Sequence, residues 1–462
     1  NTHRMLASLS IIPVPDSGQL KSYTERVKNN NRQERLALLK LLPRKGVKAV
    51  PLPERIGEPS LFQHVIYIIK ENRTYDQVLG DVSKGNGDTT LCTFGQQVTP
   101  NTHKLVNQYV LLDNYKASGK CSAEGHLWTD ASIVTDYIEK NVRAWFRSYT
   151  HVLYDAMAYP KTGFLWDNAL DHGKSVRIYG EAAVPHWNDG KTWLDIYRDF
   201  IKGKPFRFNN TTTIDRVRGI LSPSFPGYDS HNVPDVLRAK AFIEELKAFE
   251  KMEGDAFPAL TIMALPDDHT AGTSSKHPTP RAMVADNDYA LGQIVEAVSK
   301  SKFWKNTVIF VTEDDSQQGW DHVSAYRTVC MVISPYTKKA AVISTDYNQT
   351  SMIRTMEQIL GLPPMNIEDA TAKPMFDLFT NQADFTPYVA LKNQIPLDEM
   401  NPSPSALKGK EKDYARASEM MAQQGIDAGD DDLFNRIIWS SVKKGKPYPE
   451  KFAGKDKDMD DD

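Results

Sequence analysis

The sequence of 462 residues contains only three cysteines, Cys92, Cys121 and Cys330. So few cysteines exclude a disulfide-rich scaffold, and the lack of any CxxC pair excludes the common structural zinc motifs. No apolar run approaches the roughly 18 residues of a membrane span, because the longest, such as Val65–Ile69, have the length of a strand. Lysine and arginine number 56 against 59 acidic residues, so the net charge of −3 argues against a nucleic-acid partner.

The composition is that of a folded globular protein, with 40% hydrophobic and 25% charged residues, which excludes wholesale disorder. The chain starts with Asn1 instead of methionine, and we interpret it as a processed or truncated product. Residues 1–60 are expected to form a leader or linker. Its middle, Leu20–Leu42, is charged and helix-prone, and Val50–Pro59 carries three prolines.

The main body is expected over residues 61–400. Within it, residues 140–250 are too long for one crossover and rich in aromatic residues, so we predict that they form a cap over the site. Residues 401–462 form a charged tail that ends in acidic residues. Its apolar stretch 433–442 is expected to pack back on the body.

The body alternates strand-like apolar runs with helical patterns. His64–Ile69 is β-branched and aromatic, and similar runs follow at Ala259–Ala264, Thr307–Thr312 and Cys330–Ser334. In Asp286–Ser301, apolar residues recur every four positions, as in an amphipathic helix. This alternation predicts an α/β fold with a mostly parallel sheet covered by helices on both faces. Shorter runs at Tyr109–Leu112 and Ser175–Tyr179 are also predicted strands.

Polar side chains follow three of these strands directly. They are Glu71 and Asn72 after the first, Asp268 and His269 after the second, and Asp314 and Asp315 after the third, with His322 in the next loop. Ligands in an open parallel sheet bind at the carboxyl ends of the strands, so these groups should meet at one edge. Carboxylates, an amide and imidazoles suit zinc, manganese, magnesium or calcium. The alternative is that the acidic residues only cap helices.

A hydroxyl nucleophile is predicted at Ser122. From Ala123 onward the pattern is helical, which places Ser122 at the N-cap, where free backbone N–H groups and the helix dipole form an anion site. Serine is also a favoured cap, so a purely structural role is the alternative. Cys121 is a rival nucleophile, because a thiol near a helix N-terminus is activated.

Several stretches together resemble the bacterial phosphoesterase family of phospholipases C and acid phosphatases, within the alkaline phosphatase superfamily. They include HVIYIIKENRTYDQVLGD at 64–81, KASGKCSAEGH at 116–126, ALPDDHTAG at 264–272 and VIFVTEDDSQQGWDHVSAYRT at 308–328. The resemblance implies an α/β/α sandwich and metal-dependent hydrolysis of phosphate esters. It also implies an extracytoplasmic location, and residues 8–16 resemble the exit from an upstream β-propeller found in close relatives.

The resemblance also implies roles for single residues. Glu71 and Asn72 match the first metal-binding pair, and Asp314 and Asp315 match the second, with Ser122 as nucleophile beside the metal. His269 and His322 match histidines that contact the phosphate or hold a second metal, for which Asp268 is the candidate carboxylate. Asp268 and His269 are adjacent instead of spaced Asp-x-x-x-His, and Tyr326 stands where a histidine is expected, so one metal is at least as compatible as two.

The expected function is hydrolysis of phosphate monoesters through a phosphoserine intermediate. One alternative is a phosphodiesterase or phospholipase C that uses the same site, since the cap would select between these substrates. A different alternative is a binding module, in which a degenerate hydrolase recognises a surface ligand. Retention of Ser122 together with the acidic pairs argues against the binding module.

Overall fold

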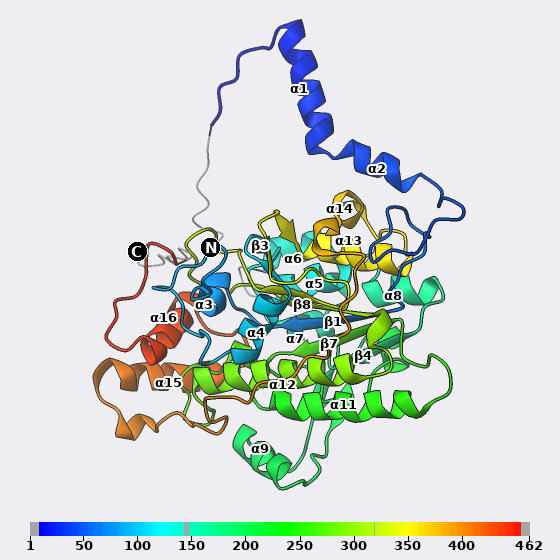
Figure 1. The fold of residues 1–462 in the computed structure, drawn as a ribbon. Helices are drawn as coiled ribbons and strands as arrows, with labels where there is room; N and C mark the ends of the chain where they lie inside the picture. Colours follow the sequence, from blue (N-terminus) through cyan, green and yellow to red (C-terminus); the bar gives the residue numbers. More distant parts are fainter. Residues whose placement is uncertain (1–8, 143–146, 318, 454–462) are drawn as a thin grey trace.

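The computed structural model describes residues 9–142, 147–317 and 319–453. At its centre lies a five-stranded sheet in the order β4-β7-β1-β8-β9 (Figure 1). All neighbours pair in parallel except β8 and β9. The strands are β4 (Val176–Tyr179), β7 (Leu260–Leu265), β1 (His64–Lys70), β8 (Thr307–Glu313) and β9 (Cys330–Ile333). Every residue of β1, β7 and β8 is buried, as the apolar runs predict for central strands.

Helices cover both faces of this sheet, and alternate residues of β1 point into two separate cores. Ile66 and Ile68 pack with one set of helices, whereas Val65, Tyr67 and Ile69 pack with the other. The first set is α4 (Pro100–Gln108), α11 (Asp235–Lys251) and α12 (Pro280–Lys300); the second is α5 (Ser122–Ala131), α8 (Leu165–Asp171) and α13 (Gln349–Leu360). The expected three-layer α/β class with a mostly parallel sheet is therefore confirmed (Figure 1).

Short strand pairs extend the structure outside the main sheet. The predicted strand at 109–112 forms β2 (Val110–Leu112), which pairs with β10 (Ala341–Ile343) and does not join the central sheet. The other pairs are β3 (Tyr115–Lys116) with β11 (Tyr347–Asn348) and β5 (Val184–His186) with β6 (Asn209–Thr211). The remaining short helices of the body are α3 (Tyr75–Leu79), α6 (Asp136–Asn141), α7 (Tyr149–Tyr154), α9 (Trp193–Ile201), α10 (Asp215–Arg218) and α14 (Ile367–Thr371).

Part of the range 140–250, which the sequence predicted as a cap, belongs to the main body. It contributes β4 to the edge of the central sheet, and α11 packs along α12 in one of the helical layers. In Figure 1, α9 lies beyond these two helices, at the bottom of the molecule. An apolar strand and an amphipathic helix bury their surface best in the main body, so only parts of this range remain available to cover the site.

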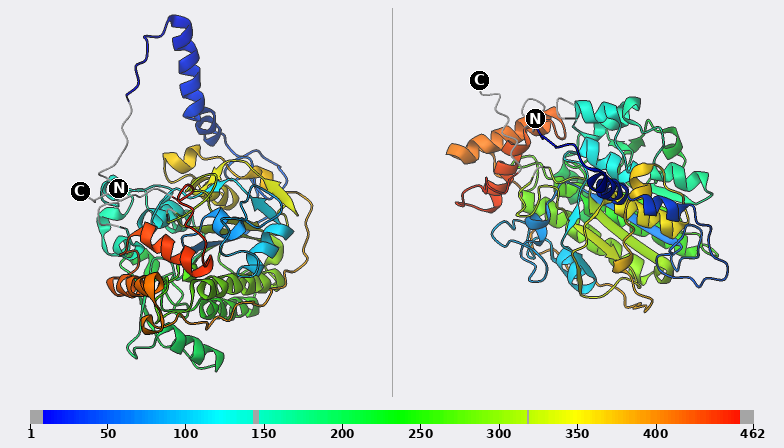
Figure 2. Two further views of the ribbon diagram at one scale, coloured as in Figure 1. Left: turned by 90° about the vertical axis from the view of Figure 1, so that its left-hand side faces the viewer. Right: turned by 90° about the horizontal axis from the view of Figure 1, so that it is seen from above.

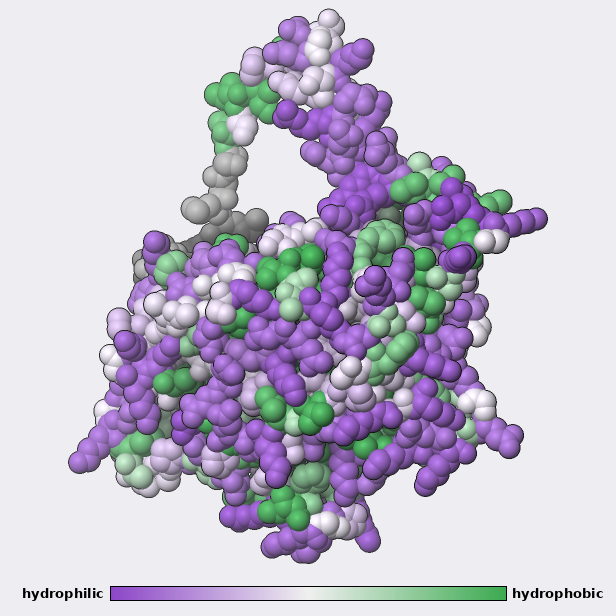
Figure 3. Space-filling model, in the orientation of Figure 1, coloured by the Kyte–Doolittle hydropathy of each residue, from purple (hydrophilic) through white to green (hydrophobic). Residues whose placement is uncertain are grey.

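Helix α1 (Ser17–Asn30) stands away from the body and buries no residue (Figures 1 and 2). Helix α2 (Gln33–Leu39) returns to the body, where Arg35 donates a hydrogen bond to the carbonyl of Ala372 at 2.8 Å. In Figure 3, α1 is mostly hydrophilic and the face of the body in view carries only scattered hydrophobic spots. None of the described helices is long and apolar enough to cross a membrane.

The C-terminal segment folds back on the body. Helix α15 (Gly409–Gln424) is followed by α16 (Asp431–Val442), which buries Phe434, Ile438 and Trp439 against the core that contains α12. Both helices lie beside one end of α12 in Figure 1. The apolar stretch 433–442 thus supplies the surface that holds this segment in place.

Candidate metal centre

Two neighbouring strands deliver the predicted carboxylates to the same place. Strands β1 and β8 are paired in parallel and end together at Lys70 and Glu313. The backbone N–H of Asp314 donates to the carbonyl of Lys70 at 2.9 Å, which keeps the two chains in register past the strand ends. The next residues on each side, Glu71 with Asn72 and Asp314 with Asp315, therefore meet at the carboxyl edge of the sheet, and all four are buried.

Ser122 joins this group from the start of α5. Its Oγ lies 3.2 Å from Glu71 Oε2, 3.3 Å from Asp315 Oδ2 and 3.5 Å from Asn72 Oδ1. Cys121 is the N-cap of α5. Ser122, which was predicted at the N-cap, is the first residue of the helix. The N–H of Ala123 donates to the carbonyl of Arg147 at 2.8 Å, so this group is not free for an anion. The hydroxyl is nevertheless surrounded by the predicted ligands.

The buried carboxylates of this group need a counter-charge if all of them are to be ionised. Burial, followed by the charges of neighbouring carboxylates, raises the pKa of Glu71 and of Asp314 well above the usual range. Burial and the charge of Asp427 raise the pKa of Asp315 to about 7. Carboxyl groups crowded together without a cation hold protons that they would otherwise lose. A divalent cation is the natural counter-charge for such a set of oxygens.

The amide of Asn72 provides a test of whether a cation fits. One of its terminal atoms lies 2.7 Å from Glu71 Oε2 and 2.9 Å from Asp314 Oδ1. With nitrogen at this position the amide donates to both carboxylates, whereas oxygen at this position would face two other oxygens and need a cation between them. Oδ2 of Asp314 is also buried, with no hydrogen-bond partner among the described residues. The residues present thus fit a divalent cation.

His126 is part of this centre, although the sequence did not single it out. Its Nε2 lies 2.8 Å from Glu71 Oε1 and 3.6 Å from Asp314 Oδ2, and its Nδ1 lies 2.9 Å from Glu181 Oε1. Burial alone would lower the pKa of His126, but the surrounding carboxylates, Glu181 above all, raise it to about 9. A usable signal was present, since residues four apart on a helix lie on one face and His126 is four positions after Ser122.

The side chain of Asp268 is engaged with groups that hold the loop in place. Its Oδ2 forms an ion pair with Lys70 Nζ at 2.9 Å, and its Oδ1 accepts from the N–H of Glu71 at 3.0 Å. Lys70 also pairs with Glu313, and Arg73 donates to the carbonyl of Asp268. Asp268 therefore helps to position Glu71, and its role as a ligand for a second ion stays a prediction.

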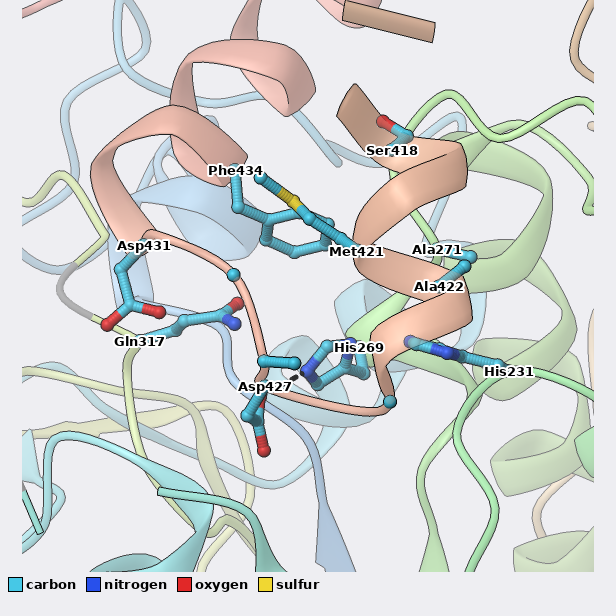
Figure 4. Close-up of a pocket in the computed structure, with 13 residues that line it drawn as sticks. His231, His269, Ala271, Gln317, Ser418, Met421, Ala422, Asp427, Asp431 and Phe434 are labelled. Atoms are coloured by element: carbon cyan, nitrogen blue, oxygen red, sulfur yellow. Dashed lines mark hydrogen bonds and ion pairs between the residues drawn. The ribbon is translucent and has the colours of Figure 1, made fainter. Parts of the chain in front are cut away.

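His269 faces a small pocket beneath the C-terminal segment (Figure 4). Its Nε2 lies 2.8 Å from Asp427 Oδ1, and both side chains are 3% exposed. His231, whose ring centroid is 5.3 Å from that of His269, lines the same pocket together with Met421 and Phe434. Asp427 lies 158 residues away in the sequence, and no pattern in the chain predicted this pair.

His322 lies in a different network. Its Nδ1 is 2.6 Å from Asp76 Oδ2, its Nε2 is 3.1 Å from Asn86 Oδ1, and Arg327 pairs with both Asp76 and Asp321. Among the described residues, no hydrogen bond or ion pair joins His322 to the groups around Ser122. The structure thus does not bring His322 to the predicted site, because the loop after β8 turns it toward α3.

A family model described as the Phosphoesterase family matches residues 84–363, more than half of the chain. The chain belongs to the phosphoesterase family. The match confirms the resemblance seen in the sequence, and it identifies the chain as a phosphoric ester hydrolase. The matched range includes Ser122, Asp314 and Asp315 and starts after Glu71 and Asn72.

Solved structures of low sequence identity are also similar to the chain. An alkaline phosphatase superfamily protein from Vibrio parahaemolyticus is 15% identical, with a TM-score of 0.44, and the match covers 76% of this chain and 79% of that one. The phosphonate monoester hydrolase of Agrobacterium radiobacter is 14% identical, with a TM-score of 0.43 and coverage of 70% and 78%. Murine ectonucleotide pyrophosphatase/phosphodiesterase 5 is 12% identical, with a TM-score of 0.40 and coverage of 69% and 100%. No curated protein matches the chain.

Proposed function

We propose that this phosphoesterase hydrolyses phosphate monoesters with the help of a divalent cation and through a phosphoserine at Ser122. The observation that carries the proposal is the position of the Ser122 hydroxyl. It lies at the start of α5, within 3.3 Å of oxygens from both Glu71 and Asp315. A cation held by Glu71, Asn72, Asp314, Asp315 and Ser122 supplies Lewis acidity that lowers the pKa of the hydroxyl and neutralises phosphoryl charge.

In the first step, formation of the phosphoserine, each of several side chains has its own role. The Ser122 hydroxyl transfers its proton to a neighbouring carboxylate, Glu71 or Asp315, as Oγ attacks phosphorus and the bond from phosphorus to the leaving oxygen breaks. The positive end of the α5 dipole stabilises charge on the phosphoryl oxygens. His269, held by Asp427, is the proposed donor of the proton that the leaving oxygen takes up. Water then hydrolyses the phosphoserine and releases phosphate and Ser122.

The parts of the range 140–250 that lie close to the centre are proposed to limit substrate size. Tyr149 stacks on His126 at a centroid distance of 3.6 Å, and Tyr228 meets the same ring edge-on at 5.3 Å. His231 lines the pocket beside His269. Tyr149 comes from the start of α7, and Tyr228 and His231 come from the loop before α11. These side chains are proposed to wall the cation centre on one side, which favours a small substrate.

A phosphodiesterase or phospholipase C with the same site is the second candidate, because the carboxylate centre serves diesters as well as monoesters. Rates on p-nitrophenyl phosphate and bis-p-nitrophenyl phosphate, each measured with zinc, manganese, magnesium and calcium, separate the two. Faster turnover of the monoester is expected. Faster turnover of the diester would favour the second candidate, and turnover of neither substrate with any metal would favour a binding module.

Ser122→Ala is expected to abolish phosphate release while the cation stays bound, because the attacking oxygen is lost and the carboxylates remain. Removal of a nucleophile typically costs several orders of magnitude in rate. Cys121→Ala is the matched control and is expected to keep most of the activity, since burial raises the pKa of the Cys121 thiol well above its usual range and leaves it unreactive. Unchanged turnover in Ser122→Ala, or a phosphoryl adduct on Cys121, contradicts the mechanism.

Two further parts of the proposal rest on the family resemblance alone. They are an extracytoplasmic location and a β-propeller in front of the phosphoesterase body in the full-length protein. Fractionation of the native cells, with antibodies against this chain, tests the location. Recovery in the cytoplasmic fraction would exclude it.

A further inference from the structure

We propose that His126 binds the cation directly through Nε2 and that Glu181 orients its ring. This inference rests on the proposed function, because it concerns the same cation centre. It adds a nitrogen ligand to the oxygen ligands of Glu71, Asn72, Ser122, Asp314 and Asp315, and this histidine is not one of those predicted from the sequence.

The imidazole of His126 lies beside the carboxylates of Glu71 and Asp314. Nε2 of His126 lies 2.8 Å from Glu71 Oε1 and 3.6 Å from Asp314 Oδ2, and the three ligand atoms of this group lie within 4.8 Å of one another. Oδ2 of Asp314 is buried, with no hydrogen-bond partner among the described residues. A buried carboxylate oxygen without a hydrogen bond, close to an imidazole nitrogen and a second carboxylate, forms a set of ligand atoms that suits a cation.

The other ring nitrogen is held as in metal-bound histidines. Nδ1 lies 2.9 Å from Glu181 Oε1, and a histidine that ligates a metal almost always donates its second N–H to a carboxylate or carbonyl. With a cation bound, this hydrogen bond would keep the remaining proton on Nδ1 and leave the Nε2 lone pair for the cation. Tyr149 stacks flat on the ring, with an interplanar angle of 9°, which prevents rotation out of this orientation.

The helix that carries His126 is packed against Asp314 more closely than a side chain would allow. A Cβ on Gly125 would lie 2.7 Å from Asp314 Oδ2 and 2.8 Å from the Asp314 carbonyl carbon and oxygen. Glycine at this position lets α5 approach β8 until the His126 ring reaches the carboxylates. The resulting set of mixed nitrogen and oxygen ligands favours manganese or zinc over calcium and magnesium, which prefer oxygen alone.

Pulsed electron paramagnetic resonance of the Mn²⁺-loaded protein tests the proposal, because a ligating imidazole produces a ¹⁴N coupling to the electron spin. We expect this coupling in the wild type and its loss in His126→Gln. His103→Gln is the matched control, since His103 is also buried and bonded to a carboxylate, Asp81, but lies outside the site. His269→Gln is expected to keep the coupling, which excludes His269 as its source.

Titration with Mn²⁺ gives a second readout. The dissociation constant is expected to rise about 10–100-fold in Glu181→Gln, the typical effect of losing a group that orients a ligand, and at least as much in His126→Gln. Wild-type protein that binds Mn²⁺ without ¹⁴N coupling overturns the inference. Coupling that persists in His126→Gln does so as well. If His126→Gln does not fold, the wild-type spectrum and the Glu181→Gln titration decide.

The failure of this inference can be told apart from failure of the proposed function. Mn²⁺ binding and monoester hydrolysis without nitrogen coupling would remove His126 as a ligand and leave the carboxylate site intact. Full Mn²⁺ binding in the double variant Asp314→Ala/Asp315→Ala would instead remove the carboxylate site itself.

Discussion

Asn72 is the residue with the least ordinary backbone in the cation centre. Its φ of 61° lies in the left-handed region, where asparagine is tolerated and most side chains are strained. This conformation turns the chain sharply after β1 and brings the Asn72 N–H to within 3.4 Å of Asp314 Oδ1. Asn72 thus has two roles: its left-handed backbone turns the chain, and its side-chain amide lies between two carboxylates.

Substitution can separate these two roles. Asn72→Ala removes the amide and forces a Cβ residue into the left-handed region, so we expect a loss of unfolding free energy of about 1 kcal/mol or more without metal. Asn72→Gly removes the same amide without the strain and should keep most of the stability. Both variants should bind Mn²⁺ more weakly. Chemical denaturation in the presence of EDTA measures the unfolding free energy, and titration with Mn²⁺ measures the binding. Equal stability of Asn72→Ala and Asn72→Gly would contradict the assignment of backbone strain.

At the scale of elements, α5 organises the site by how closely it approaches β8. It presents Ser122 and His126 on one face, while Leu127 and Ala131 pack into the core. Gly125 lies at the point of closest approach, where an added Cβ would collide with Asp314. The position of the helix, and with it the distance between hydroxyl and carboxylates, depends on the absence of a side chain there.

Gly125→Ala is therefore expected to destabilise the protein, although alanine normally favours a helix over glycine by about 1 kcal/mol. Overpacking at such a contact costs roughly 1–3 kcal/mol, and the displaced helix should also bind Mn²⁺ less tightly. Gly18→Ala in α1 is the control, since a Cβ there would meet only Asp16 Oδ1, at 3.4 Å. Thermal unfolding checks both variants, and a stabilised Gly125→Ala would show that α5 can shift without cost.

At the scale of the whole molecule, the C-terminal segment covers the site. Asp427 binds His269, Asn435 donates to the carbonyl of Gln317 at 2.9 Å, and Asp431 pairs with Arg147 near the start of α5. These contacts fasten the turn between α15 and α16 over the loops that carry His269 and Asp315. Residues far apart in the sequence thereby share one pocket (Figure 4).

Asp431→Asn is expected to loosen this cover, because it removes the charge of a carboxylate that is 4% exposed and pairs with the partly buried Arg147 guanidinium. Removal of one partner from a fully buried ion pair costs about 3 kcal/mol or more, and a smaller loss is expected for this partly buried pair. Hydrogen exchange measured by mass spectrometry should accelerate at residues 425–435 and stay unchanged in β1. Asp432→Asn is the control, since its pair with Arg436 is partly exposed on the helix surface and such pairs contribute about 0–1 kcal/mol. Equal exchange in both variants would contradict the role of Asp431.

The class of fold and the meeting of four candidate ligands at one edge of the sheet follow from the order of residues along the chain. Runs such as His64–Ile69 and Thr307–Thr312 are β-branched and unbroken, so they form buried strands in almost any context. Because parallel strands end at one edge, the residues after them had to meet, and Glu71, Asn72, Asp314 and Asp315 do so. The sequence predicted Ser122 at the N-cap of a helix, and in the structure Ser122 is the first residue of α5.

Which charged groups face one another depends on how the helices and strands pack, and the residue order does not reveal it. Asp268 and His322 share residue type and local context with the residues around Ser122, but Asp268 pairs with Lys70 and His322 pairs with Asp76. The pairing of His126 with Glu181 spans 55 residues, and it depends on the place of β4 at the edge of the sheet and of α5 on one of its faces. The physical reason is that strand and helix periodicity follow from short-range sterics and burial, whereas a side chain's partner depends on the packing of whole elements.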